Sequence, residues 1–159
     1  MAGGTYYLGA IADRYNGESE SNETNNALTG AQIEVVHDID LVNTAVSADV
    51  TSVGTGGTMN VTFTTSNQGT SASSTTTQTG IYLSTDAVIT TADQNIGAYG
   101  FYNTQLPAGG SINHTMAVTV PASMAGGTYY LGALADRHNA ESESNETNNG
   151  LAGATGHAG

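Results

Sequence analysis

The sequence predicts an all-β protein built as a sandwich of two packed sheets, and three observations carry the prediction. Short runs alternate apolar and polar residues, as in Met59–Thr64, which is the pattern of a strand packed on one side only. Clusters of turn-forming residues, such as Asn67–Gly69 and Ala125–Gly127, separate these runs. No window shows the sustained 3.6-residue apolar period of an amphipathic helix.

About seven strands are expected within roughly 115 residues, a spacing typical of an immunoglobulin-like sandwich. In chain order they are Leu41–Ser47, Met59–Thr64, Thr79–Ser84, Ile96–Tyr102, Ile112–Val120, Gly127–Asp136 and Asn148–Ala152. Tyr129 and Tyr130 open the sixth of them. Either one of the two bonds its hydroxyl to the backbone as a tyrosine corner, or both are ordinary strand tyrosines on opposite faces.

The composition restricts the classes of partner. The formal net charge is −12, and Arg14 and Arg137 are the two cationic residues apart from histidine. Such a chain is not expected to bind nucleic acid or anionic lipid, which require cationic groups, and no stretch is long and apolar enough for membrane insertion. The carboxylates outnumber their possible ion-pair partners. They either bind divalent cations or form a repulsive, soluble surface. Cysteine is absent, which excludes disulfides and thiolate metal sites.

A partial repeat suggests the domain organisation. Residues Ala2–Asn26 recur as Ala125–Asn149, with differences only at Ile11/Leu134, Tyr15/His138 and Gly17/Ala140. We interpret this as a tandem array with a period near 123 residues. Residues 1–36 are then the C-terminal hairpin of a preceding repeat plus a linker, residues 37–152 are one full sandwich, and residues 153–159 are a tail. Near-identical units favour a structural or adhesive array over an enzyme.

Several motifs together resemble a known family. They are Asp40–Val42, Asn67–Gly69, Ile81–Asp86, Asp93, Gly127–Asp136 and Glu143–Asn149. This set, spread over Asp38–Leu151, looks like the CARDB domain, a bacterial cell-adhesion-related module. In this chain Ile39 stands where the family usually has Pro before the opening Asp-Leu. The resemblance implies an immunoglobulin-like or fibronectin-like sandwich, repeated in large secreted or surface proteins, and no catalysis.

Two acidic clusters are candidate calcium sites. In the first, Asp86 and Asp93 converge if the loop between them curls back, and hydroxyls lie nearby; calcium accepts such oxygen ligands. Alternatively, these carboxylates accept backbone N–H groups and hold a turn. The second cluster is the loop from Asp136 to Asn149, with Glu143 and Glu146.

The second cluster is expected at one end of the sandwich, between the last two strands. In an array it could meet Asp38 and Asp40 of the next unit, where a shared cation would stiffen the joint. The alternative is a solvated acidic hairpin loop with Asx turns.

The N-terminal copy of the repeat raises a question about assembly. Residues from Gly3 to about Leu28 are expected to form a strand–loop–strand hairpin, and a lone hairpin is marginally stable in water. It is therefore either disordered or docked in another copy, at the place that Gly127–Leu151 fills. Such an exchange would generate open filaments or closed rings.

These inferences predict a non-catalytic structural or adhesive repeat of a bacterial extracellular or cell-surface protein, stabilised by calcium. Its partners would be neighbouring copies of the same repeat, assembled head to tail into a homopolymer. One alternative is a module that binds a surface glycan or protein, with Tyr99, Phe101 and Tyr102 as an aromatic platform. Another is an accessory domain of a secreted hydrolase.

Overall fold

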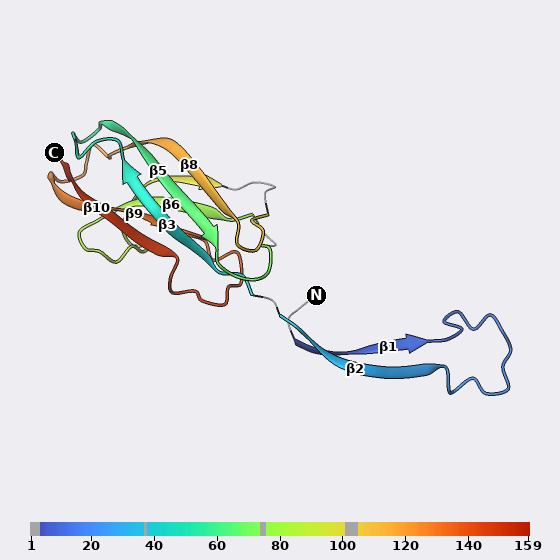
Figure 1. Cartoon of the computed structure of the whole chain (residues 1–159). Helices are drawn as coiled ribbons and strands as arrows, with labels where there is room; N and C mark the ends of the chain where they lie inside the picture. The colour runs from blue at the N-terminus through green and yellow to red at the C-terminus, as the bar shows by residue number, and fades with distance from the viewer. Residues whose placement is uncertain (1–3, 37, 74–75, 101–104) are drawn as a thin grey trace. The chain divides into compact units, whose positions relative to one another are not determined.

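A computed structural model describes residues 4–36, 38–73, 76–100 and 105–159 (Figure 1). The chain forms two compact units, Met1–His37 and Asp38–Gly159. The described residues contain strands, turns and bends but no helix, so none of them form a membrane-crossing helix.

The larger unit is a sandwich of two sheets. One sheet has the order β3-β5-β8 and the other β4-β10-β9-β6-β7. Neighbouring strands are antiparallel except β4 and β10, which are parallel. The strands are β3 (Leu41–Ala48), β4 (Ser52–Val53), β5 (Thr58–Asn67), β6 (Gln78–Ser84), β7 (Gln94–Gly100), β8 (Ser111–Thr119), β9 (Gly127–Leu134) and β10 (Gly150–Ala158). The predicted all-β, immunoglobulin-like fold is confirmed.

The core lies between the two sheets and follows the alternation in the sequence. On β5, Met59, Val61 and Phe63 are buried, while Asn60 and Thr62 are not. The facing sheet contributes the buried side chains of Ile81, Leu83, Leu131 and Ala133. The last hairpin, β9–β10, is therefore a structural part of the core.

Strand β10 differs from the prediction. The expected strand ended at Ala152 and residues 153–159 were expected to be a tail, yet β10 continues to Ala158. These residues pair with β9 on one side and with β4 on the other. Backbone pairing with two neighbours forms the strand, although a glycine-rich sequence has low β-propensity.

The smaller unit is a two-stranded antiparallel hairpin of β1 (Gly4–Ile11) and β2 (Ala27–Val35). The strand–loop–strand prediction agrees with this part of the structure, and β2 extends beyond the predicted Leu28. The apolar side chains of Tyr7, Leu8, Ile11 and Leu28 are all at least half exposed. Within its own unit the hairpin has no second layer to cover them.

Candidate functional site

The duplicated hairpin is the feature of the chain that offers a functional site. Strand β1 pairs with β2 in the register that β9 makes with β10, residue for residue at an offset of 123. For example, Tyr6 pairs with Ile33 as Tyr129 pairs with Gly156. The register shift after Tyr7 recurs after Tyr130. The two hairpins therefore have the same pairing although their second strands differ in sequence.

The loops of the two hairpins also match in their hydrogen bonds. The Asp136 carboxylate accepts the N–H groups of Ala140 and Glu141 at 3.1 and 2.8 Å. Asp13 accepts the corresponding N–H groups at 2.8 and 2.9 Å. Both aspartates adopt a left-handed backbone, with φ of 39° and 40°. The loop conformation is therefore encoded locally and does not need the sandwich.

In the sandwich, the loop 136–149 holds the start of β3. A Glu143 carboxylate oxygen accepts the backbone N–H of Leu41, and the other accepts Asn149 Nδ2 at 2.9 Å. Ser144 N donates to the carbonyl of Ile39 at 2.8 Å. Asn149 in turn accepts a bond from Asn43 Nδ2 through its carbonyl, at 3.0 Å. We call these contacts the latch between the last hairpin and the first strand.

The latch places the acidic loop against the first residues of its own sandwich. The loop 136–149 contacts the segment that holds Asp38 and Asp40 within the same unit, and the contact of this end with a neighbouring unit stays a prediction. Asn148 Nδ2 donates to Asp40 Oδ1 at 2.9 Å. Asp38 accepts the N–H and hydroxyl of Thr70 at 3.2 and 3.0 Å. The loop reaches this segment because β3 and β10 lie next to each other across the two sheets.

Burial shifts the ionisation of two latch-loop carboxyls. The pKa of Glu143 is raised from 4.5 to about 7. Desolvation is the largest cause and the charges of Asp136 and Glu146 add to it, while the bonds from Leu41 and Asn149 act against it. Desolvation also raises the pKa of Asp136. By contrast, hydrogen bonds from Ser144 and Thr70 lower the pKa of Asp38. Glu146 is exposed, and its carboxylate accepts the Glu143 N–H at 2.8 Å.

The first acidic cluster forms a turn. Asp86 Oδ1 accepts the N–H of Val88 at 2.8 Å, and Asp93 Oδ2 accepts the N–H of Thr90 at 2.7 Å. The turn carries Ile89, whose side chain is buried against Gly132 of β9. A Cβ at Gly132 would lie 2.3 Å from the Ile89 side chain, so this close approach requires glycine. The loop 86–93 thus covers the outer face of the last hairpin.

The described residues do not bring the seven candidate metal ligands together. Among the ranges that the structure describes, no group of three or more His, Cys, Asp or Glu side chains could hold a metal ion. Two buried amide oxygens, Asn148 Oδ1 and Asn149 Oδ1, accept no hydrogen bond there. They lie on the latch beside Asp40 and Glu143, and sequence patterns of carboxylates alone did not indicate them.

The aromatic side chains have structural contacts. The Tyr99 ring stacks on His114 with centroids 3.5 Å apart and meets Phe63 edge-on at 6.4 Å. Phe101 and Tyr102, the other members of the predicted platform, lie outside the described residues. The Tyr129 hydroxyl donates to the Ala125 carbonyl at 3.0 Å, which is the backbone bond of the tyrosine-corner alternative, and the residue itself is half-buried.

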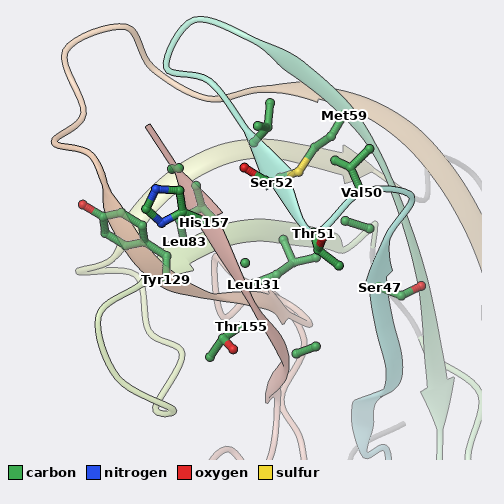
Figure 2. A pocket seen from close by; sticks show the side chains of 15 residues that line it. Ser47, Val50, Thr51, Ser52, Met59, Leu83, Tyr129, Leu131, Thr155 and His157 are labelled. Carbon is green, nitrogen blue, oxygen red and sulfur yellow. The ribbon is translucent and has the colours of Figure 1, made fainter.

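A cavity of about 120 Å³ opens beside β10 (Figure 2). Figure 2 shows Val50 and Met59 on one side of it and Tyr129, Leu83 and Leu131 on the other. Gly156 and Ala158 of β10 also line it. Two of the inward-facing positions of the last strand therefore carry little or no side chain next to unfilled space.

Comparisons with known proteins agree with this fold. The CARDB family model matches residues 38–153. The CARDB domain of a Pyrococcus furiosus protein, solved in complex with di-metal ions, is similar with a TM-score of 0.54 and 17% identity, covering 77% of this chain and 90% of that one. A solution structure of the same domain has a TM-score of 0.54 and 17% identity, with coverage of 77% and 97%.

A further similar structure comes from Methanosarcina acetivorans. It is a domain of a protein assigned to the cell surface, with a TM-score of 0.51, 24% identity and coverage of 77% of this chain and 93% of that one. At these identities the likenesses show the fold alone. No curated protein matches the chain. Because the family model spans well over half of its residues, the chain belongs to the CARDB family.

Proposed function

We propose that the chain is a non-catalytic structural repeat of a bacterial cell-surface protein, and that its N-terminal hairpin joins neighbouring copies head to tail. The observation that carries the proposal is the duplicated hairpin. It has the register and loop geometry of β9–β10, but its apolar face is exposed. Docking covers this face but uncovers the equivalent face of the displaced β9–β10 hairpin, so the net gain depends on the positions at which the two hairpins differ. The surface location rests on the family and on the surface-protein relative.

The hairpin residues fit the sites that their counterparts occupy in the sandwich. Leu8 corresponds to Leu131, which is 6% exposed in the core, whereas Leu8 is 54% exposed. Gly9 corresponds to Gly132, where the absence of a side chain leaves room for Ile89. In the isolated hairpin a Cβ at Gly9 would meet nothing closer than 3.4 Å. This glycine is therefore explained by the sandwich environment and not by the hairpin alone.

In the proposed exchange, β1–β2 of one copy replaces β9–β10 of another. The two partners bring different surfaces to this contact, so the association is heterologous and continues into filaments or closes into rings. The donor hairpin has the same residues at the latch positions, namely Glu20, Ser21 and Asn26. In the exchanged state they would make the bonds to β3 that Glu143, Ser144 and Asn149 make in the sandwich.

The size of the full chain tests this proposal. We expect a monomer when the protein is refolded at micromolar concentration, because the chain's own hairpin docks first. Refolding at near-millimolar concentration should trap multimers, since exchange depends on protein concentration. Sedimentation velocity in EDTA measures both states. Monomers alone after concentrated refolding would contradict head-to-tail assembly by exchange.

Calcium stabilisation is a second part of the proposal. The net charge of −12, the di-metal relative and the unpaired amide oxygens of Asn148 and Asn149 support it. Those oxygens, with Asp40 and Glu143, are the ligand types that calcium accepts. Millimolar calcium should raise the midpoint of thermal unfolding above its value in EDTA, by an amount that grows with calcium concentration. An unchanged midpoint would contradict calcium stabilisation and would leave the assembly proposal intact.

A further inference from the structure

The donor hairpin differs from the chain's own last hairpin at the positions that line the cavity beside β10. Ile33 and Val35 of β2 stand where β10 has Gly156 and Ala158. Near-identity between the two copies ends at Asn26 and Asn149, so these positions have diverged while the pairing register has not.

The register places residue 156 on the cavity side of its strand. Gly156 pairs with Tyr129, and directly paired residues of neighbouring strands share one face of the sheet. Tyr129 lines the cavity, as Figure 2 shows. Thr155 and His157, on the opposite parity, also border the cavity but are exposed to solvent, whereas Ala158 is buried in the core.

The space at Gly156 accepts a larger side chain. A Cβ at Gly156 would meet only the Thr51 carbonyl, at 3.5 Å, which is an ordinary van der Waals contact. Beyond it lies the cavity of about 120 Å³, with an apolar lining that includes Met59, Leu83 and Leu131. Ile33 supplies four side-chain carbons where Gly156 supplies none, and Val35 supplies two more than Ala158.

We propose that residues 4–35 of one copy dock in a second copy in place of residues 127–158, and that Ile33 and Val35 fill the cavity that Gly156 and Ala158 leave. This inference rests on the hairpin exchange proposed above. It adds that the sandwich prefers the donor hairpin to its own. Filling an apolar cavity gains the buried contacts that its lining lacks.

One position opposes the preference. Ala27 stands where β10 has Gly150, and a Cβ there would lie 2.7 Å from the Ile89 carbonyl. The loop carrying Ile89 must shift to accept the donor. Refolding of the Ala27→Gly protein should therefore give a higher multimer-to-monomer ratio than refolding of the unchanged protein.

The test compares three variants of the full chain after concentrated refolding in EDTA. Ile33→Gly/Val35→Ala gives the donor the small residues of β10. Gln32→Gly/Glu34→Ala is the matched control, because it weakens the same strand at positions whose counterparts, Thr155 and His157, border the cavity with side chains exposed to solvent. Gly156→Ile/Ala158→Val gives the chain's own hairpin the donor residues. Sedimentation velocity measures the multimer-to-monomer ratio, and thermal unfolding of dilute protein measures the midpoint.

We expect Ile33→Gly/Val35→Ala to lower the multimer-to-monomer ratio on the order of tenfold, and the control to change it about twofold or less. Gly156→Ile/Ala158→Val should raise the monomer midpoint by about 3 °C or more and also suppress multimers, since the chain's own hairpin then fills the cavity.

Equal multimer ratios in the unchanged protein and Ile33→Gly/Val35→Ala would overturn cavity filling while leaving exchange intact. A lower midpoint in Gly156→Ile/Ala158→Val would overturn it as well. Absence of multimers in every protein, with the midpoint raised, would instead refute the exchange itself.

Discussion

Leu131→Ala should lower the free energy of unfolding of the sandwich by about 2–5 kcal/mol, which is the usual cost of removing a buried leucine side chain. Leu131 is 6% exposed and lies in the core with Phe63 and Leu83. Its truncation both loses apolar burial and leaves a cavity. Urea unfolding of dilute protein, where we expect a monomer, gives the value from the change in midpoint at constant m.

The repeat supplies the matched control for this experiment. Leu8→Ala is the same substitution at the equivalent position of the other hairpin, where the side chain is 54% exposed. It should change the stability of the monomer by about 0.5 kcal/mol or less. A loss below about 1 kcal/mol for Leu131→Ala would contradict the placement of β9 in the core.

The second large effect concerns pH. Between about pH 4.5 and pH 7 the sandwich should lose stability as the pH rises, and Glu143→Gln should flatten this dependence. The pKa of Glu143 is raised by burial to about 7 in the folded protein. The folded state therefore binds more protons than the unfolded state in this window. The contribution is fully present below pH 4.5 and is lost as the pH rises through 7.

A shift of this size corresponds to about 3 to 4 kcal/mol before solvent screening, and the partial exposure of Glu143 reduces the expected change to about 1–2 kcal/mol. The raised pKa of Asp136 acts in the same direction in both proteins. Because Asp136 and Glu143 interact, the difference between the proteins measures the ionisation of Glu143 together with its coupling to Asp136. The lowered pKa of Asp38 acts at lower pH and in the opposite direction.

Urea titrations in EDTA at four or five pH values measure this difference. Glu20→Gln, at the exposed equivalent position, is the control and should leave the slope unchanged. A Glu143→Gln protein that keeps the full slope would show that Glu143 ionises normally in the folded state.

The sequence predicted the fold well because the sandwich rests on local signals. Alternation on β5 located its buried face, and turn residues located most strand ends. It did not predict β4 or the last residues of β10. Both depend on backbone pairing between segments distant in the chain, as where His157 pairs with Ser52. Pairing of this kind overrides the low propensity of a Gly-Ala-Thr-Gly run.

The candidate site was harder to predict because its contacts are long-range. Turn formation by Asp86 and Asp93 was one of the two alternatives in the sequence. The hydrogen bond from the Leu41 N–H to Glu143 joins residues 102 apart in the sequence, and no local pattern predicts it. The position beside the cavity, however, could be found from the sequence. Aligning the two repeats beyond Asn26 sets Ile33 against Gly156, a large change at a core-facing position.

Disulfide trapping tests the central claim, that the hairpin of one copy replaces the last hairpin of another. Ser84 of β6 pairs with Tyr130, whose counterpart in the donor hairpin is Tyr7. Directly paired residues have Cβ atoms about 5 Å apart, close enough for a disulfide after a small adjustment. The chain has no cysteine of its own, so Tyr7→Cys/Ser84→Cys introduces the only thiols. Ser84 is 2% exposed, so its own hairpin must leave before it can react.

Tyr15→Cys/Ser84→Cys is the control, because the counterpart of Tyr15 is His138, which contacts Gln78 at the other end of β6. Both variants are refolded at high concentration, oxidised and separated on a non-reducing gel. The account predicts a ladder of covalent multimers for Tyr7→Cys/Ser84→Cys and monomers for the control. Monomers in both, or equal ladders in both, would contradict it.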